Sequence, residues 1–186
     1  MIGYAFCGSF CTLKDSLSVL EGLSNKGYEI QPIMSETVYS TDTRFFDKEE
    51  LRRKIRSITG REIIHTVKDA EPLGPAKPLS ALIIAPCTGN TVAKLATGIT
   101  DSAVTMAAKA HLRKDRPLLI ALASNDAMSQ NLGNIGKMLS RKSVYFVPMR
   151  QDDPSGKPHS LIADFSLLEK SLELMMENKQ QRPLFL

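Results

Sequence analysis

The residues best suited to chemistry lie in one short stretch, positions 85–102. An apolar run at 81–84 precedes it and predicts a buried strand that stops at Pro86, since proline cannot donate to a continuing ladder. Small hydroxyl and amide residues follow at 88–91, and 92–96 then reads as the beginning of a helix. Ligands of open α/β sheets bind outside the carboxyl ends of the strands, where helix N-termini offer unpaired N–H groups. The stretch therefore predicts a site for an anion or a polar ring edge, although an ordinary capped strand-to-helix loop would show the same pattern.

A second turn of this kind is expected near the N-terminus. Residues 2–7 read as a buried first strand, and leucines at helical spacing over 13–23 predict the helix that follows. Gly8, Ser9 and Phe10 stand between these two elements. A Gly-Ser turn at a helix N-terminus can hold one phosphate group, but the same turn is common in α/β proteins without a ligand. The chain lacks the full G-x-G-x-x-G pattern at this place, so a dinucleotide site is only weakly supported.

The next segment continues the alternation of strands and helices. The run 28–34 predicts a second strand, and the Ser35 and Thr37 hydroxyls after it either contact a phosphate or cap a helix. Apolar residues at helical spacing then predict a helix over 48–58, which Gly60 ends. Parallel strands joined by a helix would bring Ser35 and Thr37 near the first turn.

A later strand is expected to end at the same edge of the sheet. The run 117–123 is apolar throughout and predicts a buried strand, followed by Ser124 and Asn125. The Asn125 amide offers both a donor and an acceptor, which suits a polar ring edge or a substrate carboxylate. An Asn-Asp turn that caps the next helix, expected at 131–139, is the alternative.

The remaining elements follow from turn residues and periodicity. We expect a loop over 61–78 with a short strand at 63–64, a helix over 103–112 capped by Thr100 or Asp101, a final strand at 143–148, a polar loop over 150–160, and an amphipathic C-terminal helix that begins near Ile162.

Together these elements predict a single α/β domain over 1–186, with a three-layer, Rossmann-like (flavodoxin-like) parallel sheet and helices on both faces. The net charge of +4 is mild and the basic residues are scattered, so no nucleic-acid partner is expected. An odd count of three cysteines without a signal peptide favours a reducing cytoplasm, and no apolar run is long enough to predict a membrane span.

The central stretch also carries a resemblance to a known family. Its residues match the pattern P-x-T-x-N-T-x-A-K-x-x-x-G-I-x-D at Pro86, Thr88, Asn90, Thr91, Ala93, Lys94, Gly98, Ile99 and Asp101. That pattern resembles the signature of the flavin-binding, cysteine-decarboxylase-like flavoproteins, which also include prenyl-flavin synthases. The resemblance implies FMN as a cofactor and no metal, with catalytic residues left unassigned. The implied cofactor-binding residues are Gly8, Ser9, Phe10, Ser35, Thr37, Pro86, Cys87, Thr88, Asn90, Thr91, Ser124 and Asn125.

The chain departs from this family at positions that matter for activity. Relatives that decarboxylate place a catalytic histidine about fourteen residues before the motif proline, where this chain has Pro72, and His65 lies too far upstream to replace it. Met106 stands in place of an arginine and Ser155 in place of an aromatic residue of the prenyl-transferring relatives. These departures argue against simple decarboxylation and against prenyl transfer.

Over its whole length the chain is similar to the B-type component of a two-component synthase within this family. The similarity rests on segments 3–12, 85–102, 124–127 and 151–154. The resemblance implies a partner, the A component, that binds NAD(P), a small dicarboxylate substrate, and a homo-oligomer, either a trimer or a dodecamer. Arg113, Arg150 and Lys157 are the cations that we consider for the dicarboxylate. Two hypotheses stay open: an FMN-binding oxidoreductase component, and a non-catalytic partner that keeps the fold and activates the A component. A third, an independent FMN-dependent decarboxylase, is weakened by Pro72.

Overall fold

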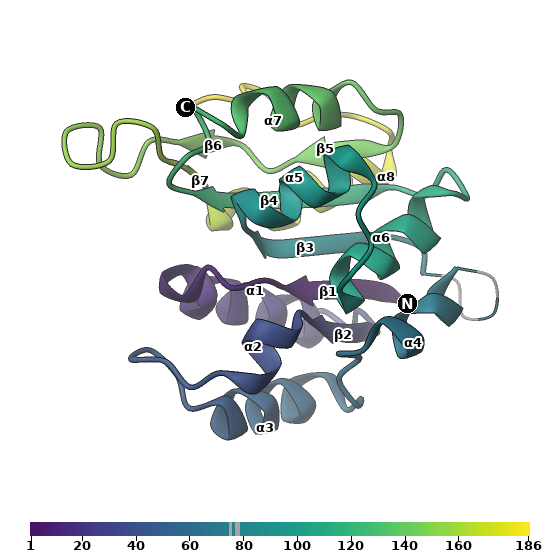
Figure 1. Cartoon of the computed structure of the whole chain (residues 1–186). Coiled ribbons are helices and arrows are strands. Elements are labelled where there is room, and N and C mark those ends of the chain that lie inside the picture. Colours follow the sequence, from purple (N-terminus) through teal and green to yellow (C-terminus); the bar gives the residue numbers. More distant parts are fainter. Residues whose placement is uncertain (75, 77–78) are drawn as a thin grey trace.

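The computed structural model describes residues 1–74, 76 and 79–186, so that three positions of the loop expected at 61–78 lie outside the described residues. Seven strands form one sheet in the order β2-β1-β3-β4-β7-β6, with β5 paired to β4. Figure 1 shows this sheet running through the molecule. The strands are β1 (Ile2–Phe6), β2 (Ile30–Met34), β3 (Leu82–Cys87), β4 (Leu118–Ser124), β5 (Val144–Phe146), β6 (Met149–Arg150) and β7 (Leu161–Ala163).

The first five strands are parallel, whereas β7 runs antiparallel to β4 and β6 antiparallel to β7. The expected parallel sheet is thus confirmed, with a short antiparallel extension at one edge. The helices are α1 (Leu13–Asn25), α2 (Glu36–Ser40), α3 (Lys48–Thr59), α4 (Val67–Ala70), α5 (Gly89–Thr97), α6 (Ala103–Leu112), α7 (Leu132–Leu139) and α8 (Leu168–Met176). None of the helices in the described part of the chain is long and apolar enough to cross a membrane.

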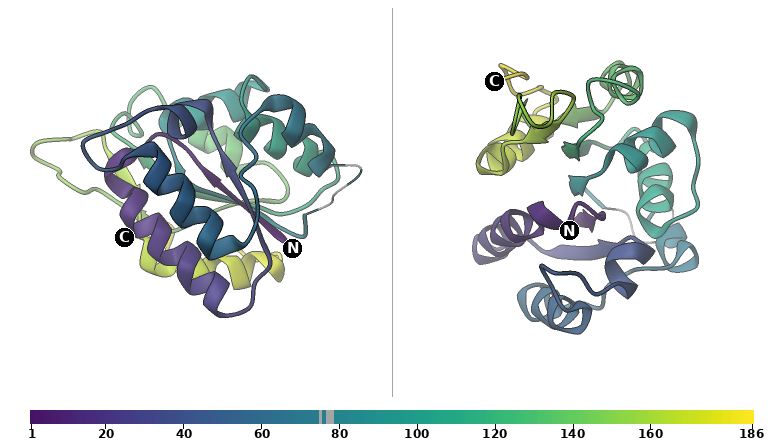
Figure 2. Two further views of the ribbon diagram at one scale, coloured as in Figure 1. Left: turned by 90° about the horizontal axis from the view of Figure 1, so that it is seen from below. Right: turned by 60° about the vertical axis from the view of Figure 1, so that its left-hand side comes forward.

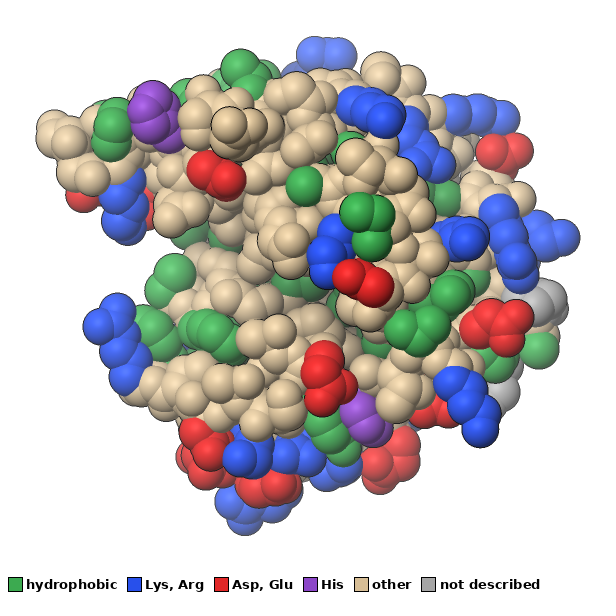
Figure 3. All heavy atoms as spheres, viewed as in Figure 1, with side chains coloured by type: hydrophobic (Ala, Val, Ile, Leu, Met, Phe, Trp, Pro, Cys, Tyr) green, Lys and Arg blue, Asp and Glu red, His purple; other side chains and the backbone are tan. Residues whose placement is uncertain are grey.

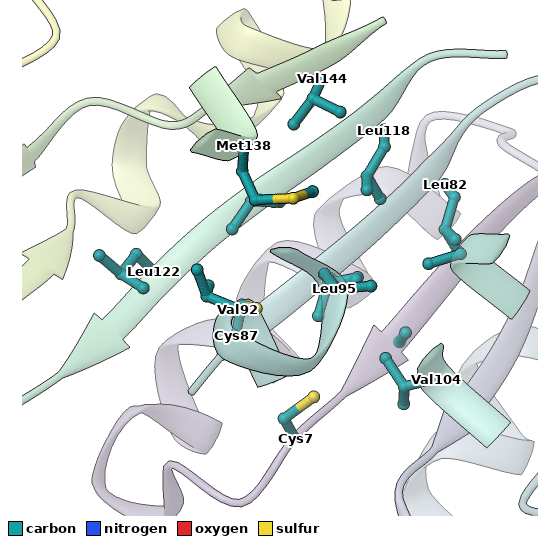
Figure 4. Packing of buried hydrophobic residues seen from close by; sticks show 14 of the residues in the cluster. Cys7, Leu82, Cys87, Val92, Leu95, Val104, Leu118, Leu122, Met138 and Val144 are labelled. Carbon is teal, nitrogen blue, oxygen red and sulfur yellow. The ribbon is translucent and has the colours of Figure 1, made fainter. Parts of the chain in front are cut away.

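Helices cover both faces of the sheet, as Figure 2 shows from two further directions. The apolar residues of α1, α3 and α8 join one buried cluster, and those of α4, α5, α6 and α7 join the other. Val92 and Leu95 of α5 lie over the ends of β1 and β3 together with Cys7 and Cys87, as Figure 4 shows. The expected three-layer, Rossmann-like arrangement is confirmed.

Strand β3 does not stop at Pro86, and that expectation is wrong. The pairing register shifts between Ile84 and Cys87, and Cys87 then pairs with Leu122 of β4. The Pro86 carbonyl accepts a hydrogen bond of 3.1 Å from the Cys7 amide. Proline lacks the backbone N–H donor but keeps its carbonyl acceptor. The hydrogen bond to the Pro86 carbonyl therefore holds the chain in the sheet across the register shift.

The cap of α6 also differs from the expectation of Thr100 or Asp101. Ser102 is the N-cap, and it forms a reciprocal pair of hydrogen bonds with Thr105. The Asp101 carboxylate instead accepts from the Lys94 ammonium at 2.7 Å. The usual capping box has Glu or Gln three residues after the N-cap, whereas this chain has Thr105 there. The sequence pattern therefore did not identify Ser102 as the cap.

Two segments expected as simple elements are built differently. The described part of the loop expected at 61–78 contains α4 and a 3-10 turn (Glu71–Leu73), while Ile64 makes only an isolated bridge to Ile33. The strand expected at 143–148 is not the final one, because β6 and β7 follow it. Ile162 lies in β7, and the C-terminal helix begins only after the 3-10 turn Phe165–Leu167. Short strands of two or three residues carry too little periodicity to be read from sequence.

One buried histidine gives the fold a dependence on pH. His111 is fully buried at the end of α6, and its Nε2–H donates to the Pro117 carbonyl at 2.8 Å. Burial lowers the pKa of His111 from 6.5 to about 4. Between these pH values the unfolded chain binds a proton that the folded chain excludes, so the free energy of unfolding falls as the pH falls from 6.5 to about 4.

We expect this histidine to account for a loss of about 3 kcal/mol across that window. The measurement is urea unfolding of the wild type and of His111→Gln, whose amide can still donate to the Pro117 carbonyl, near neutral pH and near pH 4. The variant should lose clearly less stability on acidification than the wild type. Parallel pH profiles for the two proteins would contradict this assignment.

Candidate functional site

An open cavity lies at the carboxyl ends of β1, β3 and β4, with a volume of about 740 Å³. Three strand ends line it because neighbouring parallel strands finish at the same edge of the sheet. Two other segments close its sides, the 41–47 turn between α2 and α3 and the 151–160 loop before β7. Figure 3 shows the molecule hollowed between these two segments, on the left-hand side of the view.

The first wall is the turn that follows β1. Ser9 is tied to Thr12 by three contacts, since the Thr12 amide and hydroxyl donate to the Ser9 carbonyl at 3.2 and 2.9 Å and the hydroxyl also reaches Ser9 Oγ at 3.1 Å. The Ser9 amide donates to the Cys7 carbonyl at 2.9 Å. These bonds hold Gly8 and Ser9 at the cavity in a fixed backbone geometry.

The second wall is the N-terminus of α5. Thr88 caps this helix, and its Oγ1 accepts from the Thr91 amide at 3.2 Å. The Thr91 hydroxyl lies 3.3 Å from the Cys7 sulfur and donates to it, which ties α5 to the end of β1. Asn90 is exposed at the first turn of the helix, and its side-chain amide makes no hydrogen bond with another described residue. The helix end therefore presents a free amide and a positive dipole to the cavity.

The third wall follows β4 and contains a carboxylate held by neutral donors. Ser124 Oγ donates to Asp126, and the Asn131 amide donates to both Asp126 oxygens at 2.9 and 3.0 Å. The hydrogen bond from Ser124, and then that from Asn131, lowers the pKa of Asp126 below its usual range. Asn131 is buried beneath the cluster, whereas Asn125 is exposed at the cavity without a side-chain hydrogen bond to another described residue.

The 151–160 loop brings a charged pair to the opposite lip. The Lys157 ammonium lies 2.9 Å from the Asp152 carboxylate. Hydrogen bonding from Ser160, and then from Lys157, lowers the pKa of Asp152. The cavity thus carries two carboxylates and two cations, the second cation being Arg44 of the 41–47 turn.

The buried thiols near the site are not nucleophiles. Burial raises the pKa of Cys7 to about 11 and raises that of Cys87 well above its usual range, so both stay protonated at neutral pH. Cys11 is exposed at the rim of the cavity. Within the described residues no group of His, Cys, Asp and Glu side chains could hold a metal ion.

The structure brings seven of the twelve predicted site residues to the cavity: Gly8, Ser9, Phe10, Thr88, Asn90, Ser124 and Asn125. The other five are not among the residues that line it. Ser35 caps α2, Thr37 approaches Gly8 from the same helix, and Thr91 is buried beneath the N-terminus of α5. Pro86 and Cys87 are buried within β3.

Of the cations considered for a dicarboxylate, only Lys157 lines the cavity. Arg150 pairs with Asp164 outside it, and Arg113 lies at the far end of α6. Sequence reasoning missed Arg44 and Phe45, which line the cavity from a turn whose position depends on tertiary packing. It also missed Asp126 and Asp152 as cavity residues, although both neighbour predicted segments.

This fold and this cavity define an α/β protein whose candidate ligand site is built from strand ends and a helix N-terminus. The chain belongs to the Flavoprotein family, whose model matches residues 1–163. A relative in sequence is the B component of dipicolinate synthase from Bacillus subtilis (strain 168), which is 42% identical over 183 residues, 98% of this chain and 92% of the relative.

Solved structures agree with that relationship. The crystal structure of the B component of dipicolinate synthase from Bacillus halodurans C matches with a TM-score of 0.91 and 38% identity, over 100% of this chain and 95% of that one. The FMN-dependent cysteine decarboxylase SpaF shares the fold, with a TM-score of 0.71 and 21% identity over 95% of each chain. The similarity to the B component of dipicolinate synthase that segments 3–12, 85–102, 124–127 and 151–154 indicate is thereby confirmed.

Proposed function

We propose that this chain binds FMN in the cavity and acts as the B component of a dipicolinate synthase. With a nicotinamide-binding A component it would oxidise a dihydrodipicolinate-level precursor to dipicolinate, late in sporulation and in the mother cell. The observation that carries the proposal is the 42% identity to a named B component of dipicolinate synthase along 98% of the chain. An enzyme-related role also agrees with the Flavoprotein family match.

The residues around the cavity are of the types that can bind a flavin mononucleotide. The backbone amides of the turn at Gly8 and Ser9 and the N-terminus of α5 suit the phosphate and the polar chain. The free amides of Asn90 and Asn125 suit the ring edge, which has both donors and acceptors. Apolar surface for the ring comes from side chains that include Phe10. FMN, when bound, supplies the capacity to accept a hydride or electrons.

The protein's own contribution is binding and electrostatics. Aromatisation of a dihydropyridine removes a hydride and a proton, so a two-electron acceptor and a proton acceptor are both needed. The hydride chemistry would belong to the flavin or to the nicotinamide nucleotide of the A component, and solvent would take the proton. The Asp126 carboxylate stays charged and fixes Ser124 beside Asn125, which keeps this wall in one arrangement. Arg44 and Lys157 are the two cations that a dicarboxylate would meet in the cavity, and Lys157 is paired with Asp152.

One observation favours a second function, in which the chain is a non-catalytic partner that keeps the flavoprotein fold and activates the A component. The position of the family's catalytic histidine is taken by Pro72, which lies in a 3-10 turn away from the cavity. No histidine lines the cavity in the described part of the chain, and we therefore do not propose an independent FMN-dependent decarboxylase. A homo-oligomer, trimeric or dodecameric, is expected with either function.

Reconstitution tests the two functions against each other. The chain is mixed with the A component, NAD(P) and the precursor, with and without FMN, and dipicolinate formation is followed. We expect product only with both components, and a loss of activity when FMN is removed from this chain. Full activity of a flavin-free complex would contradict the FMN-dependent function and leave the non-catalytic one.

A further inference from the structure

The 41–47 turn is the one wall of the cavity that does not come from the end of a strand or from the loop before β7. It joins α2 to α3 and contributes two side chains to the cavity, Arg44 and Phe45. Both side chains are exposed, and Phe45 is among the few large apolar residues that the fold leaves open, with 44% of its surface exposed.

Hydrogen bonds hold this turn in one conformation. The Thr43 amide donates to the Phe46 carbonyl at 3.0 Å, and Thr43 Oγ1 accepts from the amides of Phe45 and Phe46 at 3.2 and 3.1 Å. At its far end the Asp42 carboxylate accepts from both the amide and the ammonium of Lys48, at 3.0 and 2.9 Å. Phe46 packs against the core cluster of α1 and α3. The turn is therefore anchored on both sides of the two residues that it presents.

The two presented side chains contact each other. The Arg44 guanidinium carbon lies 4.7 Å from the centre of the Phe45 ring, which is cation–π distance. Arg44 takes part in none of the ion pairs among the described residues, whereas the other cavity cation, Lys157, is already paired with Asp152. Arg44 is thus the cation whose charge is available to a ligand.

We propose that Arg44 and Phe45 form the substrate-recognition element of the cavity, selective for a planar ring that bears a carboxylate. A guanidinium stacked on an aromatic ring keeps its edge N–H donors free, and their fork matches the two oxygens of a carboxylate. Phe45 restrains that fork and offers an apolar surface to the ligand ring. This inference rests on the proposed function, since it assigns the substrate class of the same cavity.

The test is calorimetric titration of the whole chain, FMN-saturated and flavin-free, with pyridine-2,6-dicarboxylate and with glutarate, a dicarboxylate without a ring. The variants are Arg44→Gln and Phe45→Leu, and the matched control is Arg53→Gln, an exposed arginine of α3 outside the cavity. FMN affinity is measured separately for each protein by flavin absorbance, and folding by thermal unfolding.

We expect Arg44→Gln to weaken pyridine-2,6-dicarboxylate binding by about 10-fold or more, because a charge-assisted pair is lost. Phe45→Leu should weaken it by about 2- to 10-fold and bring its affinity closer to that of glutarate. Arg53→Gln should bind as the wild type does, and FMN affinity should be the same in all four proteins.

Other results would overturn the inference without touching the proposed function. One such result is a wild type that binds FMN but not the ring dicarboxylate. Another is equal affinity of the wild type and of Arg44→Gln for the ring dicarboxylate. A third is an Arg44→Gln protein that loses affinity for FMN alone, which would make Arg44 a cofactor contact. A wild type that binds the ring dicarboxylate through Arg44 but takes up no FMN would support the inference and count against the flavin site instead.

Discussion

Gly89→Ala is expected to lower the activity of the reconstituted complex by about 100-fold while the chain still folds. A Cβ at this first residue of α5 would meet Ser124 Oγ, with Asn131 Nδ2 at 2.6 Å and Asp126 Oδ1 at 2.7 Å. All three belong to the hydrogen-bonded cluster of the third wall, and Asn131 is too deeply buried to move outward. The methyl group would therefore displace the cluster and the helix end relative to each other.

The structural cost should be modest, about 1–3 kcal/mol of unfolding free energy, as for other overpacked sites. Gly133→Ala is the matched control, since a Cβ there would meet nothing within 4 Å and α7 should gain up to about 1 kcal/mol. Steady-state kinetics measure the activity of both variants, and urea unfolding measures the change in their stability. Full activity in Gly89→Ala would mean that the cluster does not position the site.

Asn125→Asp is expected to lower kcat/KM of the complex by about 100-fold. The change keeps the shape of an exposed side chain at the cavity and replaces its amide with a second carboxylate next to Asp126. Two like charges at about 4 Å repel by roughly 1 kcal/mol in water and 4 kcal/mol near a protein surface, and a dicarboxylate substrate adds to that repulsion. Part of the loss should be relieved at high ionic strength, because salt screens exposed charges.

Asn178→Asp, an exposed asparagine outside the cavity, is the control and should behave as the wild type does. The measurement is kcat/KM at low and high salt, with thermal unfolding in parallel. If Asn125 only shapes the turn before α7, the variant would unfold at a lower temperature and keep its kcat/KM. That result would remove Asn125 from the site.

The parts of the fold that could be predicted from sequence are those with long periodic patterns. The leucines of α1 and the capped helix α3 with Gly60 at its end lie where spacing and end signals place them. The antiparallel strands β6 and β7 could not be predicted, since each has two or three residues and exists through pairing with β4 or with its neighbour. Strand β3 continues beyond Pro86 because the Cys7 amide, directly after β1, donates a hydrogen bond to the Pro86 carbonyl. This contact depends on tertiary packing and leaves no signal in the local sequence.

The candidate site divides along the same line. Turns that directly follow buried strands, such as Gly8–Phe10 and Ser124–Asn125, were predicted as cavity residues and lie there, because strand direction alone fixes the edge. The contribution of Arg44 and Phe45 depends on how α2 and α3 pack beside β2, and no local signal marks it. Thr91 was predicted for the site from its motif, yet its hydroxyl forms hydrogen bonds with the Cys7 sulfur and with the hydroxyl of the N-cap residue Thr88.

The most direct test of the central claim is the visible absorption spectrum of the chain after saturation with FMN and gel filtration. We expect flavin absorption to elute with the protein at one FMN per chain and to fall in Gly89→Ala, whose extra methyl group alters the helix end and the third wall. A protein peak without flavin absorption after saturation would contradict the claim that this cavity is an FMN site.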